Sequence, residues 1–193
     1  MTAGTSASAL LLLVSVGALV AISGCEDTKD AGGVSSADTK AGSPATDFTT
    51  RDAQGNNFRL SEHLGKEAIL IDFWATWCQP CLAEMPHMER MYREKKAKGF
   101  LVVAVSMDGT ESLADVKSYG PRNGLTFPIL LDEDSRIASI YNSRKSAPLS
   151  VLIDKDGRIA AVREGYNTGD EVYLEKDVDK VLDKPLDPGP AAK

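Results

Sequence analysis

The sequence is poor in the residues that hold metal ions and structural cross-links. Its 193 residues include three cysteines and two histidines. A structural zinc site needs four ligands, and Cys25, His63 and His87 stand at no recognised zinc spacing from the remaining cysteine pair. The chain also lacks a c-type haem motif and a nucleotide-binding loop. We therefore expect neither a metal nor an organic cofactor.

Positive charge is scarce as well. Lys and Arg together number 22 against 28 Asp and Glu, which gives a net charge of −6 at pH 7. With no basic stripe in the sequence, this balance argues against a nucleic-acid partner. The first 24 residues carry no charged side chain, and residues 9–22 form a continuous apolar run. The run has the length of a signal peptide and is slightly short for a membrane span.

The apolar run ends in the letters AISGC, the last of which is Cys25. This ending resembles a bacterial lipobox, in which the cysteine is lipidated and becomes the mature N-terminus. The resemblance implies a signal peptide over residues 1–24 and a lipid on Cys25. Residues 1–9 lack the Lys or Arg usual in a signal peptide, and an uncleaved N-terminal anchor is the alternative. Both interpretations predict a domain on the extracytoplasmic (periplasmic) face of a bacterial membrane.

Composition sets the expected domain boundaries. Residues 26–44 contain no aromatic residue and one Val as their only sizeable apolar side chain, so they cannot bury enough surface to fold. We expect residues 25–44 to form the lipidated cysteine and a flexible tether. The folded domain is predicted over residues 45–184, and the Pro- and Gly-rich residues 185–193 are predicted to be a tail.

Residues 69–86, ILIDFWATWCQPCLAEMP, combine a buried strand with the start of a helix. Cys78 and Cys81 stand where the strand gives way to the helix. Unpaired N–H groups and a partial positive charge at a helix N-terminus stabilise a thiolate, which lowers the pKa of the thiol. We expect Cys78, nearer the helix start and more exposed, to attack a substrate disulfide. Cys81, one turn further, would resolve the mixed disulfide.

The pattern F-W-A-T-W-C-x-P-C after an apolar strand resembles the thioredoxin superfamily. Glu84, three residues after Cys81, is similar to the glutamate of the membrane-tethered TlpA/ResA branch. Asp72, six residues before Cys78, matches the buried aspartate of thioredoxin. Burial would raise the pKa of Asp72 and suit it to take a proton from Cys81. Glu84 could do the same, or could lie on a solvated helix face.

Four further residues are expected to support this site. Trp77, Gln79 and Pro80 flank the cysteines, and Trp77 is expected to pack over them. The resemblance also implies that Pro148 is the cis-proline that faces the cysteine pair at the start of a strand, where its backbone pairs with the bound substrate segment. Leu149 follows it, where the family more often has Thr or Ser.

The fold expected from these patterns and from the resemblance is α/β and thioredoxin-like. A central mixed β-sheet is flanked by helices, with an N-terminal β-hairpin and a central helix–strand insertion. The predicted strands cover residues 47–50, 58–60, 69–74, 100–106, 127–131, 148–154 and 158–164. The predicted helices cover residues 60–65 with Ser61 as cap, 78–98, 112–119, 134–141 and 170–182.

The resemblance implies a membrane-anchored thiol–disulfide oxidoreductase. Pro80 stands before the second cysteine, where oxidising members tend to have histidine, so we expect a reductase. Its partners would be protein thiols and disulfides, such as apocytochrome c awaiting haem, and a membrane electron donor of the thiol–disulfide type. A thiol peroxidase is one alternative, although Ala75 stands where peroxiredoxins want Thr or Ser. A thioredoxin-like copper chaperone is another, although its cysteines are spaced by three residues.

Overall fold

The computed structural model describes residues 39–185. The predicted signal peptide, Cys25, most of the predicted tether and nearly all of the predicted tail lie outside these residues. Within residues 39–185, none of the helices combines the length and the apolar character that a membrane crossing requires.

A five-stranded sheet forms the centre of the domain, in the order β5-β4-β3-β6-β7. Strands β3 (Ala68–Trp74), β4 (Phe100–Ser106) and β5 (Ile129–Leu131) are parallel, whereas β6 (Leu149–Ile153) and β7 (Ile159–Glu164) run antiparallel to their neighbours. Every residue of β3 and β4 is buried. Continuous burial is expected for parallel strands that are covered on both faces, and the predicted mixed sheet is confirmed.

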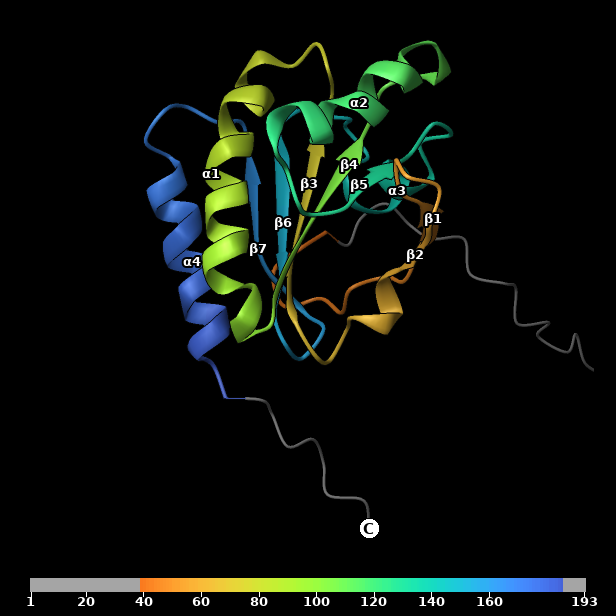
Figure 1. The fold of residues 1–193 in the computed structure, drawn as a ribbon. Helices are drawn as coiled ribbons and strands as arrows, with labels where there is room; N and C mark the ends of the chain where they lie inside the picture. Colours follow the sequence, from red (N-terminus) through yellow and green to blue (C-terminus); the bar gives the residue numbers. More distant parts are fainter. Residues whose placement is uncertain (1–38, 186–193) are drawn as a thin grey trace, which may run out of the picture. The chain divides into compact units, whose positions relative to one another are not determined.

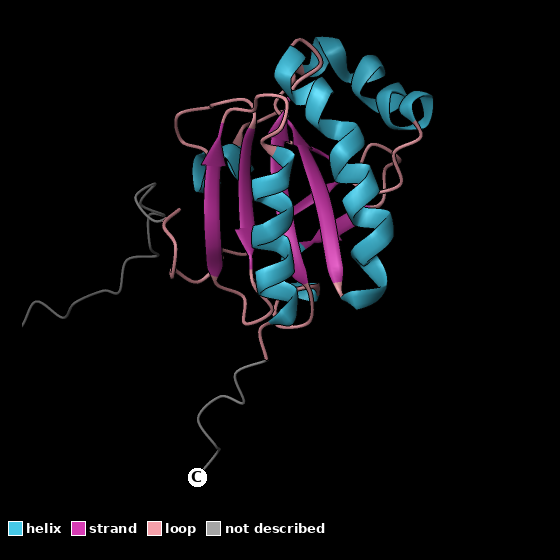
Figure 2. Ribbon diagram, turned by 90° about the vertical axis from the view of Figure 1, so that its left-hand side faces the viewer, coloured by secondary structure: helices cyan, strands magenta, loops and turns pink. Residues whose placement is uncertain are grey.

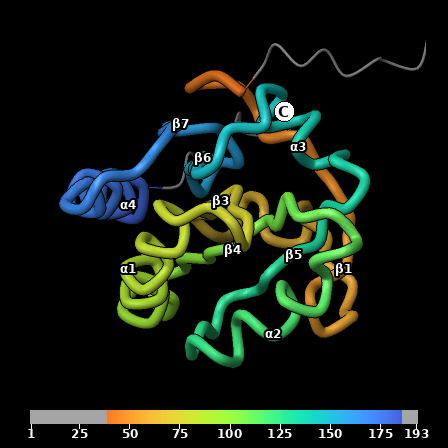
Figure 3. The backbone as a smooth tube through the Cα atoms, turned by 90° about the horizontal axis from the view of Figure 1, so that it is seen from above, coloured from red at the N-terminus to blue at the C-terminus, as the bar shows by residue number. Residues whose placement is uncertain are grey.

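Helices cover one face of this sheet (Figures 1 and 2). They are α1 (Gln79–Lys95), α2 (Leu113–Asn123) and α4 (Glu171–Asp183), and the view from above places them on one side of the strands (Figure 3). The short helix α3 (Arg136–Tyr141) packs on the opposite face. The helix–strand–helix sequence of α2, β5 and α3 is the predicted insertion.

Alternation along β3 divides the core between the two faces. Leu70 and Trp74 pack with buried residues of α1 and α4, while Ile71 and Phe73 pack with the N-terminal hairpin and α3. Successive strand residues point to opposite faces, so an apolar run with no polar alternation serves both cores. Asp72 shares its face with Leu70 and Trp74, which is the face that carries α1.

The N-terminal hairpin consists of β1 (Thr49–Arg51) and β2 (Asn57–Arg59), followed by the 3₁₀ turn η1 (Leu60–Glu62). The predicted hairpin is confirmed with shorter strands. The prediction that Ser61 caps the helical turn is wrong. Its own backbone N–H instead donates to Asp47 Oδ1 at 2.8 Å, because the turn begins at Leu60 and its N-cap is Arg59.

The C-terminal ends of α1 and α2 differ most from the prediction. Helix α1 ends at Lys95 and continues as a 3₁₀ turn, η2 (Lys96–Lys98), before Gly99, which has the left-handed conformation expected of a helix-terminating glycine (φ 82°). Helix α2 was expected to end near Gly120 and Pro121 but runs on to Asn123. Gly120 explains this, because a proline restricts the preceding residue partly through a clash with its Cβ, which glycine lacks.

The folded part of the chain begins before residue 45. The N–H of Gly42 donates to Ile159 O at 2.7 Å, Ile159 N–H donates to Ser43 O at 2.8 Å, and Ala45 N–H donates to Gly157 O at 2.8 Å. This segment therefore pairs with the start of β7, although the sequence predicted a tether up to residue 44. Backbone pairing needs no apolar side chains, so composition gave no sign of it.

Candidate active site

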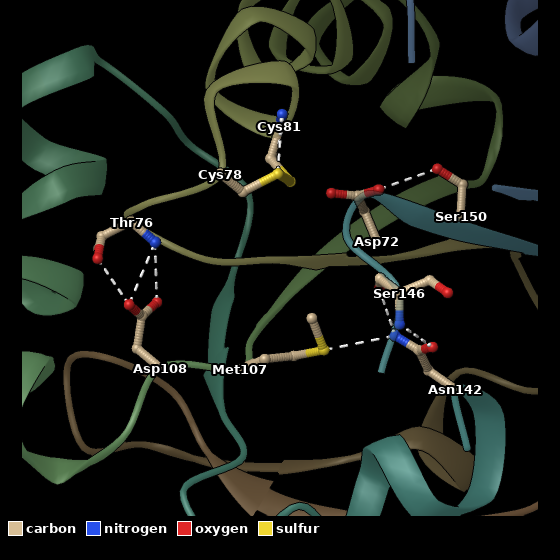
Figure 4. Close-up of a disulfide and its surroundings, with 9 residues drawn as sticks. All are labelled: Asp72, Thr76, Cys78, Cys81, Met107, Asp108, Asn142, Ser146 and Ser150. Atoms are coloured by element: carbon tan, nitrogen blue, oxygen red, sulfur yellow. Dashed lines mark hydrogen bonds between the residues drawn. A yellow bond between two sulfur atoms is a disulfide. The ribbon is translucent and has the colours of Figure 1, made fainter. Parts of the chain in front are cut away.

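The two cysteines lie at the junction of β3 and α1, as predicted, and form a disulfide (Figure 4). Cys78 is the N-cap of α1, and its Sγ accepts a hydrogen bond from the backbone N–H of Cys81 at 3.3 Å. Pro80 lies in the first turn, where a missing N–H costs no helical hydrogen bond. Sulfur at this cap position therefore faces backbone N–H groups that favour a thiolate once the disulfide is reduced.

The two cysteines differ only slightly in solvent exposure. Cys78 is 4% exposed and Cys81 is fully buried, which agrees with the expected order of attack and resolution. Gln79 and Pro80 are exposed beside them. The side chain of Trp77, which was expected to pack over the cysteines, is 67% exposed. Trp74 fills the core instead, with its ring 4.9 Å from that of Tyr119.

A buried carboxylate that the sequence did not reveal holds the turn before Cys78. Asp108 accepts hydrogen bonds from the backbone N–H of Thr76 at 3.0 and 3.2 Å and from the Thr76 hydroxyl at 2.6 Å. Ser106 at the end of β4 donates to the same carboxylate at 2.9 Å. Because β3 and β4 are parallel neighbours, their carboxyl ends lie at one edge of the sheet. The parallel pairing of these two strands was the only feature predicted from the sequence that could have indicated the contact between Asp108 and Thr76.

Replacing Asp108 with alanine is expected to destabilise the domain by about 1 to 3 kcal/mol, since the donors on Thr76 would lose their acceptor in a largely buried place. Urea unfolding of the full chain measures the change. Asp134→Ala is the matched control, because Asp134 is an exposed aspartate that pairs with nearby Arg136 on the surface. Equal stability of the two variants would contradict the anchoring role.

Asp72 is fully buried in the middle of the sheet. It pairs in register with Ser150 of β6, and the Ser150 hydroxyl donates to Asp72 Oδ1 at 2.9 Å. Burial raises the pKa of Asp72 to about 7, against the opposing effect of the Ser150 hydrogen bond. Figure 4 shows the carboxyl group on the side of the sheet where the disulfide lies. A carboxyl with this pKa can both accept and release a proton near neutral pH.

Glu84 does not lie on a solvated helix face. Its side chain is 5% exposed, and Oε2 has no hydrogen-bond partner within residues 39–185. Burial raises the pKa of Glu84 to about 9, with further contributions from the negative charges of Asp72, Asp170 and Glu171. Sequence position could not decide between the two interpretations, because the residues that bury Glu84 are brought there by tertiary packing.

The Ala147–Pro148 peptide bond is cis, in agreement with the resemblance. The loop before it is held by Asn142, whose Nδ2 donates to Ser146 O at 2.7 Å and whose Oδ1 accepts from Ser146 N–H at 2.8 Å. The same Nδ2 lies 3.4 Å from the sulfur of Met107. Asn142 thus ties this loop to the end of β4, a positioning role that the sequence did not suggest.

As for metals, no group of three or more His, Cys, Asp or Glu side chains within residues 39–185 is arranged to hold an ion. The site presents a dithiol, Cys78 and Cys81, and two buried carboxyls, Asp72 and Glu84. The fold and this arrangement together define a thioredoxin-like dithiol site at the start of a helix.

Comparison with known proteins gives the family. Residues 41–162 match the model of the AhpC/TSA family, and the chain belongs to that family. The thiol-disulfide oxidoreductase ResA of Geobacillus kaustophilus is 40% identical over 101 residues, which are 52% of this chain and 56% of that protein. ResA of Bacillus subtilis is 36% identical over 101 residues. The chain thus spans about half the length of the curated relatives it matches.

Solved structures extend the likeness over more of the chain. A structure from Chlorobium tepidum with the provisional name thiol:disulfide interchange protein DsbE is 31% identical, has a TM-score of 0.68, and covers 74% of this chain and 98% of its own. A second thiol:disulfide interchange protein from Chlorobium tepidum, of the thioredoxin family, is 26% identical with a TM-score of 0.64. The predicted thioredoxin-like fold and the resemblance to ResA-like proteins are confirmed.

Proposed function

We propose that this protein is a thiol–disulfide oxidoreductase that reduces disulfides in exported proteins. The observation that carries the proposal is the Cys78–Cys81 disulfide at the N-terminus of α1, on the same face of the sheet as the buried carboxyl of Asp72. A purely structural disulfide would not need a titratable group beside it. The names of the relatives support the same chemistry.

The first step is attack by the reduced Cys78. Its thiolate, stabilised at the cap position by the N–H of Cys81, attacks a sulfur of the substrate disulfide. A Cys78–substrate mixed disulfide forms, and the other substrate sulfur leaves as a thiolate that takes a proton from water. The exposed Trp77, Gln79 and Pro80 and the loop ending at Pro148 form the surface that a substrate segment would meet.

The second step is resolution by Cys81. Its thiol passes a proton to the carboxylate of Asp72, and the resulting thiolate attacks Cys78 Sγ. The Cys78–Cys81 disulfide forms and the reduced substrate leaves. Glu84 lies within electrostatic range of Asp72 and is protonated at neutral pH, because burial raises its pKa to about 9.

The direction of the reaction and its location rest on the sequence. Pro80 before the second cysteine favours a reductase, and the lipobox-like ending at Cys25 favours a lipid anchor on the periplasmic face of a bacterial membrane. A reductase there needs an electron donor of the thiol–disulfide type in the membrane. Oxidised apocytochrome c is the client that the sequence resemblance implies.

The reduction potential tests the direction. We expect the full chain, equilibrated with reduced and oxidised glutathione, to show a Cys78–Cys81 potential below about −200 mV, as for thioredoxin-type reductants. The fraction of free thiol, measured by alkylation and mass spectrometry, gives the value. A potential near about −120 mV would instead place the protein with oxidants of the DsbA kind.

Rapid consumption of hydrogen peroxide would favour the alternative function of a thiol peroxidase. We do not expect this result, because Ala75 lacks the hydroxyl that peroxiredoxins carry at this position.

A further inference from the structure

Ser150 is the one polar residue of β6, whose sequence is LSVLI. Its side chain is 5% exposed, and a buried hydroxyl is costly unless it is hydrogen-bonded. The antiparallel register pairs Ser150 directly with Asp72, and the hydroxyl donates to Asp72 Oδ1 at 2.9 Å. The two residues are 78 positions apart in the chain, so only the sheet brings them together.

The two oxygens of Asp72 differ in their surroundings. Oδ1 is occupied by the Ser150 hydroxyl, whereas Oδ2 has no hydrogen-bond partner in the described part of the chain. In Figure 4 the occupied oxygen faces Ser150, and the other points away from it, toward the side on which the disulfide lies. The hydroxyl therefore fixes the rotation of the carboxyl group and leaves a single oxygen available to exchange a proton with the cysteine pair.

We propose that Ser150 is a positioning residue that acts on the dithiol chemistry through Asp72, by holding one carboxyl oxygen and presenting the other to Cys81. This inference rests on the proposed function. The atoms balance within the resolving step. The Cys81 proton moves to Asp72 Oδ2 and the Cys81–Cys78 sulfur bond forms. The bond from Cys78 to the substrate breaks, and the substrate sulfur leaves as a thiolate that takes a proton from water. Ser150 keeps its own proton throughout.

Other ionisable groups also lie near the carboxyl group of Asp72. From α1 they are Cys78, Cys81 and Glu84, and the charges of Asp170 and Glu171 at the start of α4 act on Glu84. Of the groups that act on Asp72, the Ser150 hydroxyl is the one that favours its ionised form. Removal of the Ser150 hydroxyl should therefore raise the pKa of Asp72, while the other groups stay in place.

The test compares wild type, Ser150→Ala, Asp72→Asn and the double variant as full chains. Stopped-flow mixing of the reduced chains with excess oxidised glutathione gives the rate of disulfide formation as a function of pH. We expect the Ser150→Ala profile to shift upward by about one to two pH units, which is the effect of losing a hydrogen bond to a charged group, and the rate at pH 7 to fall about tenfold. In the Asp72→Asn background, Ser150→Ala should change nothing.

Two controls separate positioning from packing. Thr50→Val removes another strand hydroxyl, which donates to Leu131 O at 2.6 Å away from the site, and should lower stability without shifting the profile. Ser150→Thr keeps the hydroxyl and should restore the wild-type midpoint. An unshifted Ser150→Ala profile, or the same shift with and without Asp72, would overturn the inference.

A second readout does not depend on activity. The carboxyl carbon of Asp72, followed by ¹³C NMR in the oxidised full chain, should titrate at higher pH in Ser150→Ala than in wild type. If wild type fails to react with glutathione while this shift is present, the proposed function fails and the effect of Ser150 on Asp72 stands. If wild type reacts and the shift is absent, only the inference about Ser150 fails.

Discussion

Replacing Cys78 with serine is expected to abolish disulfide reduction and leave only the uncatalysed rate. Cys78 supplies the nucleophile, and a serine hydroxyl in the same place is neither ionised near neutral pH nor able to form a disulfide. The N-cap hydrogen bond from Cys81 N–H can be kept by the serine oxygen, so the fold should survive. Insulin reduction with dithiothreitol as electron source measures the loss.

Cys81→Ser is the matched control for this prediction. It keeps the attacking thiol and removes the resolving one, so a mixed disulfide between Cys78 and a substrate should accumulate. Non-reducing electrophoresis and mass spectrometry detect this adduct. If Cys81→Ser forms no adduct, or if Cys78→Ser forms one through Cys81, the assigned order of the two cysteines is wrong.

Replacing Asp72 with asparagine is expected to change the pH dependence of stability strongly. In the folded chain Asp72 keeps its proton up to a pKa of about 7, whereas the unfolded chain releases it near 3.8. Between these values the folded state binds more protons, so wild-type stability falls as pH rises from about 4 to about 7. Asparagine does not titrate and is free of this loss.

The difference between the two chains should therefore grow with pH. Three pKa units correspond to roughly 4 kcal/mol, so the free energy of unfolding of Asp72→Asn should gain roughly that much relative to wild type between pH 4 and pH 8. Urea unfolding of the oxidised full chains at several pH values measures it. A constant difference across this range would mean that Asp72 does not titrate with a raised pKa.

The same variant should lose activity while it gains stability. Without a carboxylate to take the proton of Cys81, the resolving step at pH 7 should slow by about a hundredfold, within the range for general acid–base groups. Asp179→Asn is a suitable control, since Asp179 is a half-exposed aspartate that pairs with Lys95 on the helical surface. It should alter neither the rate nor the slope of stability with pH.

The local part of the site could be predicted because its determinants are contiguous. A β-forming apolar run followed by two cysteines at helical spacing specifies a strand, a turn and a helix N-terminus, and the N-terminal position of Cys78 then fixes its chemistry. The central strands and the hairpin followed from the same kind of pattern. Boundaries were harder to predict, as the continuation of α2 past Pro121 shows, because Gly120 lacks the Cβ through which a proline restricts the residue before it.

Tertiary contacts supply the groups that act on the cysteines from distant positions in the chain. Asp108 reaches Thr76 because β3 and β4 are parallel neighbours, and Ser150 reaches Asp72 because β6 is antiparallel to β3. Glu84 is buried by its packed surroundings and not by its own sequence context. Sequence patterns record which residues prefer to be buried, whereas the pKa of a buried carboxyl depends on which groups the fold brings against it.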